Sequence, residues 1–440
     1  MLDYLFIRAK VYINGKFVNT NLGVTGDSIT YIGKDQPVAK KVVNVNNNRI
    51  IPGLIDPHVH FELNCGTITS RDDFYYGSKS ASLGGVTTII DFLDPSRNAK
   101  ELEETFKVRN ELAKKSNVDY HFHACIKEPD GELEDYVLKM KKLGMNSIKL
   151  FTTYSETHRR TSDEDIIKLL KLSKKYNFIV EAHIENDEMI LHDKKLTYKD
   201  LPRARSSEAE TSEALKLCEF AKKTKGYLYM VHCSSGKTLE AIVKNYKSLI
   251  NKNIFIESCP QYFVFNNEVL KQRSGYLYTF APPLRSEEER KLMFKYFDYI
   301  HSIGTDHCSF NIADKKSHQY LEGMPLGIGG IESSFLIMYQ LFGDKAIDKM
   351  SKNVASIQRL GRIGEIKVGN YANLVFVSDR KKLVGKPHGK ADYSVYQRLM
   401  VNHSILSTMI RGRFIFRNKK FCPGKGQLIN CEAKLNESFN

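Results

Sequence analysis

Residues 50–62, IIPGLIDPHVHFE, contain the stretch that decides the fold. An apolar run closed by Asp56-Pro57 leads into His58 and His60, which alternate with a valine. Residues two apart on a β-strand point to the same side, so both imidazoles face the same way at the end of a buried strand. Together they can bind one ion. Alone the pair is a weak signal, because a strand can contain two histidines by chance.

Apolar, β-rich runs of this kind recur through the middle of the chain. The eight runs are GLIDPHVHF (53–61), VTTIIDF (86–92), DYHFHACI (119–126), NSIKLF (146–151), NFIVEAHI (177–184), GYLYMVHC (226–233), NIFIESC (253–259) and YIHSIGTDH (299–307). Amphipathic, helix-like stretches such as ELEETFKVRNELAKK (101–115) separate most of them. Eight βα units over about 250 residues are typical of a (β/α)8 TIM barrel. A doubly wound sheet is the competing fold, but no GxGxxG follows the first run.

The two ends of the chain are β-rich in a different way. KVYINGKFVN (10–19) places Asn-Gly between two β-rich arms, which predicts a hairpin, and ILSTMIRGRFIFRN (405–418) repeats the pattern. We expect the ends to form one small β-sandwich around an inserted α/β barrel. The predicted boundaries are 1–51 for the first part of the sandwich, 52–355 for the barrel, and 356–440 for the second part and a tail.

Bulk properties indicate an ordinary globular protein. The chain is 42% hydrophobic and 27% charged, and its formal net charge is +15. A basic balance suggests nucleic-acid binding, but the basic residues are spread among carboxylates along helix-like stretches, so we expect a solvated surface and no nucleic-acid partner. Eight cysteines without CxxC spacing indicate reduced thiols in a cytoplasmic protein. The sequence contains no run of ~18 apolar residues, so it predicts no membrane-spanning helix.

Polar residues mark the ends of several predicted strands, where the catalytic residues of a TIM barrel lie. They are His58, His60, Lys149, His183, His232 and Asp306. A single histidine here is more often a hydrogen-bonded core residue than a ligand. Four of the chain's 13 histidines at strand ends, with a carboxylate after the last strand, make that explanation improbable. Imidazole and carboxylate are ordinary ligands of Zn²⁺ and similar ions, so the pattern predicts a catalytic metal site.

Lys149 is the exception in this set, because an ammonium has no lone pair for a metal. The side chain could instead extend past apolar neighbours to reach water. If it is buried, its pKa falls and the neutral amine becomes a nucleophile. Addition of CO₂ would give a carbamate able to bridge two ions. The residues alone do not decide between these alternatives.

With these residues in place, the chain resembles the amidohydrolase superfamily, and within it the dihydropyrimidinase/hydantoinase group of cyclic amidases. The resemblance spans residues from about 5 to 415 and keeps the family's order and spacing. The motifs that carry it are IIPGLIDPHVHFE, GTITSRDDFYYGSKSASLGGVTTIIDF, SIKLFTTYS, VEAHIEND, LYMVHCSS, IESCPQYF, APPLR, GTDHCSF and ADYSVYQ.

The resemblance implies two divalent ions, usually zinc, in a TIM barrel beside a β-sandwich. By position, His58, His60 and Asp306 would hold the more buried ion. His183 and His232 would hold the more exposed ion, and Lys149, carboxylated to N6-carboxylysine, would bridge the two. The family also implies a homo-oligomer, either a dimer or a tetramer.

The family's chemistry opens the ring of a cyclic ureide, a dihydropyrimidine or a 5-substituted hydantoin. A hydroxide that bridges the metals attacks a ring carbonyl, and the product is an N-carbamoyl amino acid. By resemblance, Tyr154 would stabilise the oxyanion, and Asp306 would carry a proton from the hydroxide to the leaving nitrogen.

The substrate pocket departs from the family pattern at two positions. Leu326 precedes Gly327 where the family usually has Asn-Gly, and Ala281 stands where a serine or threonine is common. Both contacts survive the change if the backbone makes them. Phe61, Leu63 and Leu93 are the candidate apolar wall of the pocket.

Three other functions are alternatives to the opening of a dihydropyrimidine or hydantoin ring. Dihydroorotases usually follow the two histidines with x-Arg, whereas Phe61-Glu62 stands here, which argues against an anionic substrate. Allantoinase is closer, but RDDF (71–74) resembles hydantoinases more than the Glu-Gly-Phe run typical there. A non-catalytic relative would be an oligomeric scaffold that has lost its metal ligands, whereas all six ligand positions are filled in this chain.

Overall fold

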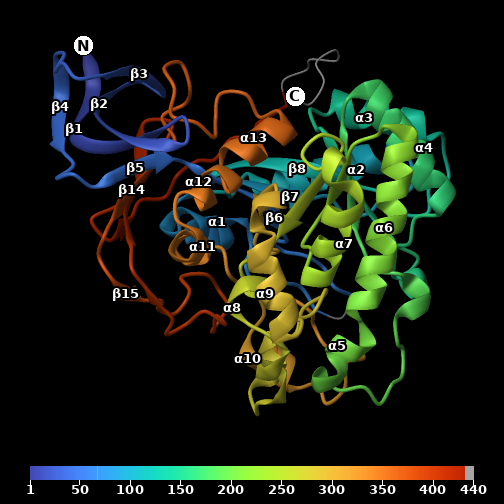
Figure 1. Cartoon of the computed structure of the whole chain (residues 1–440). Coiled ribbons are helices and arrows are strands. Elements are labelled where there is room, and N and C mark those ends of the chain that lie inside the picture. Colours follow the sequence, from blue (N-terminus) through green and yellow to red (C-terminus); the bar gives the residue numbers. More distant parts are fainter. Residues whose placement is uncertain (67, 432–440) are drawn as a thin grey trace.

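The computed structural model describes residues 1–66 and 68–431. Figure 1 shows a strand barrel surrounded by helices, with a second, β-rich body beside it. The blue N-terminal strands and the red C-terminal strands lie together in that second body. The predicted fold class, a TIM barrel with a small β domain built from both chain ends, is therefore confirmed.

Eight parallel strands form the barrel, and neighbours in the sheet are neighbours in the sequence. They are β6 (Leu54–Val59), β7 (Val86–Phe92), β8 (Asp119–Cys125), β9 (Ser147–Phe151), β10 (Ile179–His183), β11 (Leu228–Met230), β12 (Ile254–Ser258) and β13 (Ser302–Ile303). Each lies within one of the eight predicted runs. Their residues are almost all buried, because one face fills the barrel and the other contacts helices. A bridge between Val59 and His307 closes the seam between the first and last strands.

Helices cover the outside of the barrel. The longer ones are α1 (Phe74–Leu83), α2 (Ala99–Ala113), α3 (Leu133–Lys142), α4 (Asp163–Tyr176), α6 (Ser207–Thr224), α7 (Gly236–Tyr246), α9 (Glu287–Lys295) and α11 (Ser334–Phe342). Shorter ones are α5 (Leu201–Ala204), α8 (Gln261–Val264), α10 (Ile312–Lys316), α12 (Lys345–Lys349) and α13 (Lys352–Gln358). Several begin at polar caps: Asn98 and Ser162 accept hydrogen bonds from backbone N–H groups of the first turn. These caps satisfy donors that the helix itself leaves unpaired.

The second body is a nine-stranded sheet in the order β19-β18-β17-β14-β5-β1-β2-β3, with β4 paired to β1. Its strands are β1 (Leu2–Ile13), β2 (Lys16–Thr25), β3 (Ser28–Gly33), β4 (Ala39–Asn44), β5 (Arg49–Pro52), β14 (Leu374–Ser378), β17 (Ser404–Ile410), β18 (Arg413–Arg417) and β19 (Lys420–Phe421). A separate pair consists of β15 (Lys382–Leu383) and β16 (Met400–Val401). Asn14 and Gly15 turn β1 into β2 with φ of 49° and 80°, as the Asn-Gly signal predicts.

A single residue, Gly53, separates β5 of the sheet from β6 of the barrel. Its amide donates to the Asn373 carbonyl (2.7 Å). A side-chain carbon at this position would lie 2.7 Å from Cγ2 of Thr87 and 2.8 Å from Cβ of Asn373, closer than real contacts allow. The junction between the two bodies therefore requires glycine.

The later part of the chain returns to the barrel at two places. The boundary predicted at residue 355 falls inside α13, whose Gln358 donates to Glu181 of β10 (2.9 Å). The tail then runs along the beginning of β8, where Tyr120 donates to Gln427 (3.0 Å) and accepts from Ile429 (2.8 Å). Residues 432–440 of the predicted third segment lie outside the described residues. Across the described chain, no helix is long and apolar enough to cross a membrane.

Candidate metal centre

Three of the predicted ligands meet where the first and last barrel strands adjoin. His58 lies near the end of β6, His60 just beyond it, and Asp306 follows β13. Nε2 of His58 lies 3.2 Å from Nε2 of His60, and each of these atoms lies 3.3 Å from Oδ1 of Asp306. Three lone-pair atoms from two strands thus converge on one point, as the alternation of His58 and His60 predicts.

The other two histidines form a second pair. His183 ends β10, and His232 follows β11 by two residues with a left-handed φ of 39°. Nδ1 of His183 lies 3.0 Å from Nε2 of His232. The ring centroids of His58 and His232 are 5.3 Å apart, so the two groups of ligands adjoin each other.

Lys149 lies in β9, between Cys125 of β8 and Glu181 of β10 in the strand register. Only 3% of the residue is exposed, and its Nζ lies 5.2 Å from the ring centre of Phe92. Burial lowers the pKa of its ammonium, while nearby carboxylates, Glu181 first, act in the opposite direction. The side chain is enclosed at the rim and does not extend to water.

Tyr154 follows β9 with a left-handed φ of 69°. Its ring lies 5.2 Å from the His183 ring, and the Arg205 guanidinium lies 4.7 Å from its ring centre. Burial raises the pKa of the phenol to about 12, although Arg205 acts to lower it. The hydroxyl therefore keeps its proton at neutral pH and is available as a hydrogen-bond donor.

Two buried carboxylates stand behind the histidines, and our sequence analysis missed both. Oε1 of Glu257 lies 2.8 Å from Nδ1 of His58, and Oε2 of Glu185 lies 2.7 Å from Nε2 of His183. Glu185 is also paired with Arg205. Carboxylates in this position fix the orientation of an imidazole and raise its basicity as a ligand. A sequence signal existed for Glu185, because it follows His183 by two residues in VEAHIEND.

These residues fit a metal centre. Glu257 and Glu185 each occupy the outer nitrogen of a histidine, so Nε2 of His58 and Nδ1 of His183 are left facing the other ligand atoms. Burial lowers the pKa of His58 well below its usual range, which keeps this imidazole neutral. Neutral imidazoles with a carboxylate are a donor set suited to Zn²⁺ and related ions.

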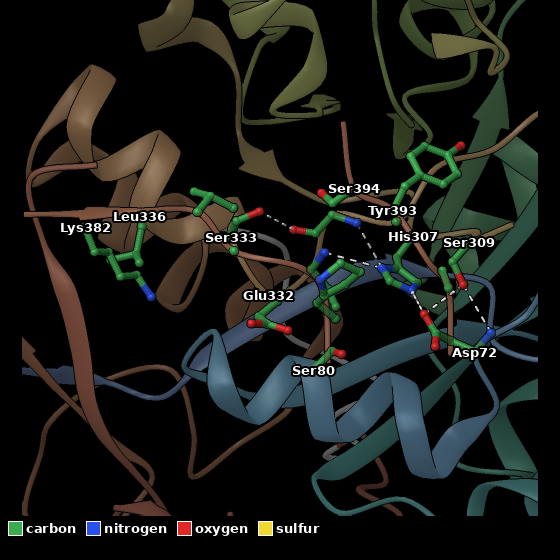
Figure 2. Close-up of a pocket in the computed structure, with 17 residues that line it drawn as sticks. Asp72, Ser80, His307, Ser309, Glu332, Ser333, Leu336, Lys382, Tyr393 and Ser394 are labelled. Atoms are coloured by element: carbon green, nitrogen blue, oxygen red, sulfur yellow. Dashed lines mark hydrogen bonds and ion pairs between the residues drawn. The ribbon is translucent and has the colours of Figure 1, made fainter. Parts of the chain in front are cut away.

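The residue after Asp306 is fixed by a hydrogen-bond network, shown in Figure 2. Nδ1 of His307 accepts from the amides of Gly330 (3.1 Å) and Ile331 (3.3 Å), so Nε2 carries the proton and donates to Asp72 (2.9 Å). The His307 carbonyl in turn accepts from the His60 amide (2.9 Å). This network holds the backbone at Asp306, whose φ is 51°.

The candidate substrate residues lie in different environments. Phe61 is fully buried, with its ring against those of Phe74 in α1 and His307. Leu93 is also buried, in the core. Leu63, Ala281 and Leu326 are partly exposed on loops. The Phe61 ring therefore belongs to the core between helix α1 and His307 and is not exposed in a pocket.

Comparison with known proteins identifies the family of the chain. Residues 49–415 match the Amidohydrolase family. The chain is 27% identical to a D-hydantoinase of Geobacillus stearothermophilus, over 93% of this chain and 92% of that protein. It is 28% identical to a D-phenylhydantoinase of Escherichia coli, over 86% of this chain and 87% of the relative. The solved D-hydantoinase (dihydropyrimidinase) of a Thermus species superposes with a TM-score of 0.91 at 25% identity, covering 98% of this chain and 99% of that one. The chain belongs to the amidohydrolase family.

Proposed function

We propose that this protein is a metal-dependent cyclic amidohydrolase that opens a dihydropyrimidine or 5-substituted hydantoin ring to an N-carbamoyl amino acid. The observation that carries the proposal is the convergence of His58, His60 and Asp306, with the His183–His232 pair beside them, at the strand ends of the barrel. Family membership and relatives named as hydantoinases support the same substrate class.

The proposed centre holds two divalent ions, most commonly Zn²⁺. His58, His60 and Asp306 would bind one, and His183 and His232 the other. Lys149 would bridge them as a carbamate, formed when its neutral amine adds to CO₂ and loses a proton. Its burial beside both groups of ligands supports this role, because an enclosed ammonium is disfavoured and a carbamate matches the charge of two cations.

Bound divalent ions lower the pKa of a coordinated water and polarise a carbonyl. The chain's own residues supply the rest of the chemistry. Asp306 would accept the proton of the attacking water and deliver it to the leaving ring nitrogen. Tyr154, with its proton retained, would donate a hydrogen bond to the carbonyl oxygen as negative charge develops there.

We also propose that residues on the loops and in the core shape the substrate pocket. Leu63, Ala281 and Leu326 lie on partly exposed loops, where they can contact a ring substituent or its amide edge. Phe61 and Leu93 would act from within the core, by shaping the wall. A homo-oligomer, dimer or tetramer, is proposed on the family resemblance alone.

A substrate panel on metal-loaded protein tests the function. Dihydrouracil, hydantoins, allantoin and dihydroorotate would be supplied in parallel, with ring opening followed by ultraviolet absorbance. We expect turnover of dihydrouracil or a hydantoin. Preference for allantoin or dihydroorotate would replace the proposed substrate class with that of the rival enzyme. Metal binding without turnover of any of the four would contradict the proposed substrate class, and failure to bind metal would favour a scaffold.

A further inference from the structure

A groove of about 630 Å³ crosses one face of the second, β-rich body. Its lining comes from the end of β4 and the loop before β5, from the segment that follows β14, and from β17 and β18 with the turn after β18. Among the described residues, its lining shares none with the proposed metal ligands or substrate residues. Pockets for small organic molecules have volumes of roughly 300–1,000 Å³, so the groove is a separate candidate binding site.

The charged side chains that line the groove are all cationic. They are Arg380, Lys381, Lys382, Arg417 and Lys419. No aspartate or glutamate is found among the described residues of the lining. Asp379 precedes Arg380 in the sequence, but it is already paired with Arg49 and His403. The groove therefore carries positive charge that the chain does not neutralise within it.

These five cations lack the ion pairs that other surface lysines make. Within the described part of the chain, none of the five forms an ion pair with a carboxylate. By contrast, exposed Lys175 is paired with Glu134 (2.6 Å). Exposed Lys345 is likewise paired with Asp298 (2.7 Å). Cations gathered in one groove raise the local concentration of anions, so this lining favours an anionic ligand.

Aromatic rings line the same groove. Phe414 and Phe416 of β18 are half-buried, and Phe376 of β14 is buried behind them with its ring centre 5.7 Å from that of Phe414. The Arg417 guanidinium lies 4.5 Å from the ring centre of Phe414. Flat bases stack on aromatic rings and on guanidinium planes, whatever their sequence. The groove thus offers an apolar stacking surface next to its cations.

Two tight turns at the groove contain non-glycine residues with a left-handed backbone. Asn418 and Lys419, which join β18 to β19, have φ angles of 52° and 62°, and Asn46 and Asn47 have φ angles of 53° and 60°. The second residue of a two-residue hairpin turn is usually glycine, which adopts positive φ at no steric cost. Lys419 places a cation in the groove where the turn itself favours glycine. The amides of Asn46 and Asn418 can hydrogen-bond to the edge of a base.

We propose that this groove binds a nucleoside triphosphate, with its phosphates against Arg380, Arg417 and Lys419 and its base against the Phe416 ring. Guanidinium groups bind phosphate oxygens through paired, charge-assisted hydrogen bonds. A ligand that is only charged would leave the rings unused, and an uncharged aromatic ligand would leave the cations unused. The lining therefore selects a molecule with both features. The site does not depend on the proposed hydrolase function.

Isothermal titration calorimetry of the metal-loaded, full-length protein tests the proposal. Adenosine triphosphate and inorganic tripolyphosphate would be titrated separately at physiological ionic strength. We expect one molecule of the nucleotide to bind per chain. It should bind about tenfold or more tightly than tripolyphosphate, because only the nucleotide has a base to stack.

Arg380→Ala/Lys419→Ala should weaken nucleotide binding about tenfold or more, because two charged partners of the phosphates are removed. Both side chains are exposed, so the fold should not depend on them. Lys115→Ala/Arg273→Ala is the matched control, since it removes the same two charges from exposed positions elsewhere and should keep the parental affinity.

Phe416→Leu tests the position of the base. It keeps an apolar side chain, so it should lower the affinity for the nucleotide toward that for tripolyphosphate and leave tripolyphosphate binding unchanged. Lys382 is left intact in all variants, because it also lines the cavity beside His307 that Figure 2 shows.

Absence of nucleotide binding, or parental affinity in Arg380→Ala/Lys419→Ala, would overturn the proposal. Equal affinities for the nucleotide and tripolyphosphate would overturn the assignment of a base to the groove. Tighter binding of a single-stranded RNA of eight bases than of the free nucleotide would make nucleic acid the ligand instead. Ring opening is not measured in any arm, so failure of the proposed function would leave these outcomes unchanged.

Discussion

Three side chains at the metal centre belong to residues with a left-handed backbone. The φ angle is 69° at Tyr154, 39° at His232 and 51° at Asp306. A non-glycine residue in this region costs about 1–2 kcal/mol, so such residues persist only where their surroundings hold them. Each follows a barrel strand and turns its side chain back over the strand ends. Part of the stability of the fold is thus given up to orient these groups.

The bridging role of Lys149 leads to the first prediction. Lys149→Ala should lose bound metal, because the ions would lose their shared ligand, and activity should fall on the order of 100-fold or more. Added short carboxylic acids should restore part of both, since they can occupy the place of the carbamate. Metal content by atomic spectrometry, with and without propionate, measures the effect.

Lys171→Ala, which removes an exposed lysine on α4, is the matched control and should keep its metal. Unchanged metal content in Lys149→Ala would rule out the bridging role.

For Asp306 we predict a loss of turnover without a loss of metal. Asp306→Asn keeps an oxygen that can still face His58 and His60, so metal should largely remain. Turnover should fall about 10²–10⁴-fold, because the amide cannot accept the proton of the attacking water. Metal analysis beside steady-state kinetics separates the two effects. Near-normal turnover would exclude Asp306 as the proton carrier.

The candidate metal ligands could be predicted from the sequence, but the carboxylates that hydrogen-bond to them could not. The histidines stood out because a polar ring at the end of an apolar strand is rare, and the structure brings these residues together. Glu257 and Glu185 were missed because their role depends on which imidazole nitrogen each one meets, and that is set by the positions of neighbouring strands. Phe61 follows His60 in sequence, yet its ring packs against Phe74 and His307.

Among the shorter elements, α10 carries a lysine that lies in the protein interior. Lys315 is fully buried, and its ammonium donates to the carbonyl (2.7 Å) and the hydroxyl (2.9 Å) of Thr279. Burial lowers the pKa of Lys315 to about 7, opposed only in part by Cys308. The Thr279 carbonyl also accepts from the Gly327 amide (3.0 Å), so α10 is connected to the loop beside Leu326.

This lysine predicts a pH dependence of stability. Between about pH 7 and the ordinary lysine pKa of 10.5, the unfolded chain holds a proton that folded Lys315 has lost. Stability should therefore rise with pH across this window, by at most about 1.4 kcal/mol per pH unit from this group. Lys315→Met should remove that contribution, so its advantage over the parent should be largest at pH 7 or below and shrink toward pH 10.

Urea unfolding at several pH values measures this effect. Lys316→Met, which removes the exposed neighbour in the same helix, should leave the slope unchanged. A Lys315→Met variant whose stability kept the parental pH slope would contradict the assignment.

Strands were more predictable than short helices. The eight barrel strands are long apolar runs bounded by turns, so their pattern survives in the sequence. β13 has only two residues although its run spans nine, because the segment that follows it is joined to β6 by the single Val59–His307 bridge and not by a continuous ladder. Helices such as α10 (Ile312–Lys316) have one or two turns, and their existence depends on contacts such as that of Lys315 with Thr279.

At the scale of the whole molecule, the two bodies are joined at Gly53. Gly53→Ala should destabilise the protein by about 1–3 kcal/mol, because the new carbon would press against Thr87 of the barrel and Asn373 beside β14. The thermal transition should remain single, since both bodies meet at this residue. Calorimetry measures both the midpoint and the number of transitions.

Gly385→Ala is the control, because a side-chain carbon there meets open space, and it should change stability by less than about 0.5 kcal/mol. Two separate transitions in Gly53→Ala would show that the bodies unfold independently.

The sequence predicts that the β-strands of the two chain ends form one domain, but it does not predict which strands pair with each other. Hairpin signals at both ends indicated β structure, and a barrel between them suggested that they meet. The partner of each strand depends on contacts between residues more than 300 positions apart, such as Ile51 of β5 with Val375 of β14. No local pattern encodes that choice.

The position of β5 between β1 and β14 also constrains how the protein can be made. β1–β5 are synthesised first, but the edge of β5 that pairs with β14 has no partner until residue 374 has left the ribosome. During translation of the whole barrel, that edge is open to other strands, and unpaired edges are sites of misassembly. Slow elongation before residue 374, or premature termination after β13 and before residue 374, should therefore yield chains that associate through their first fifty residues, although they carry all eight strands of the barrel.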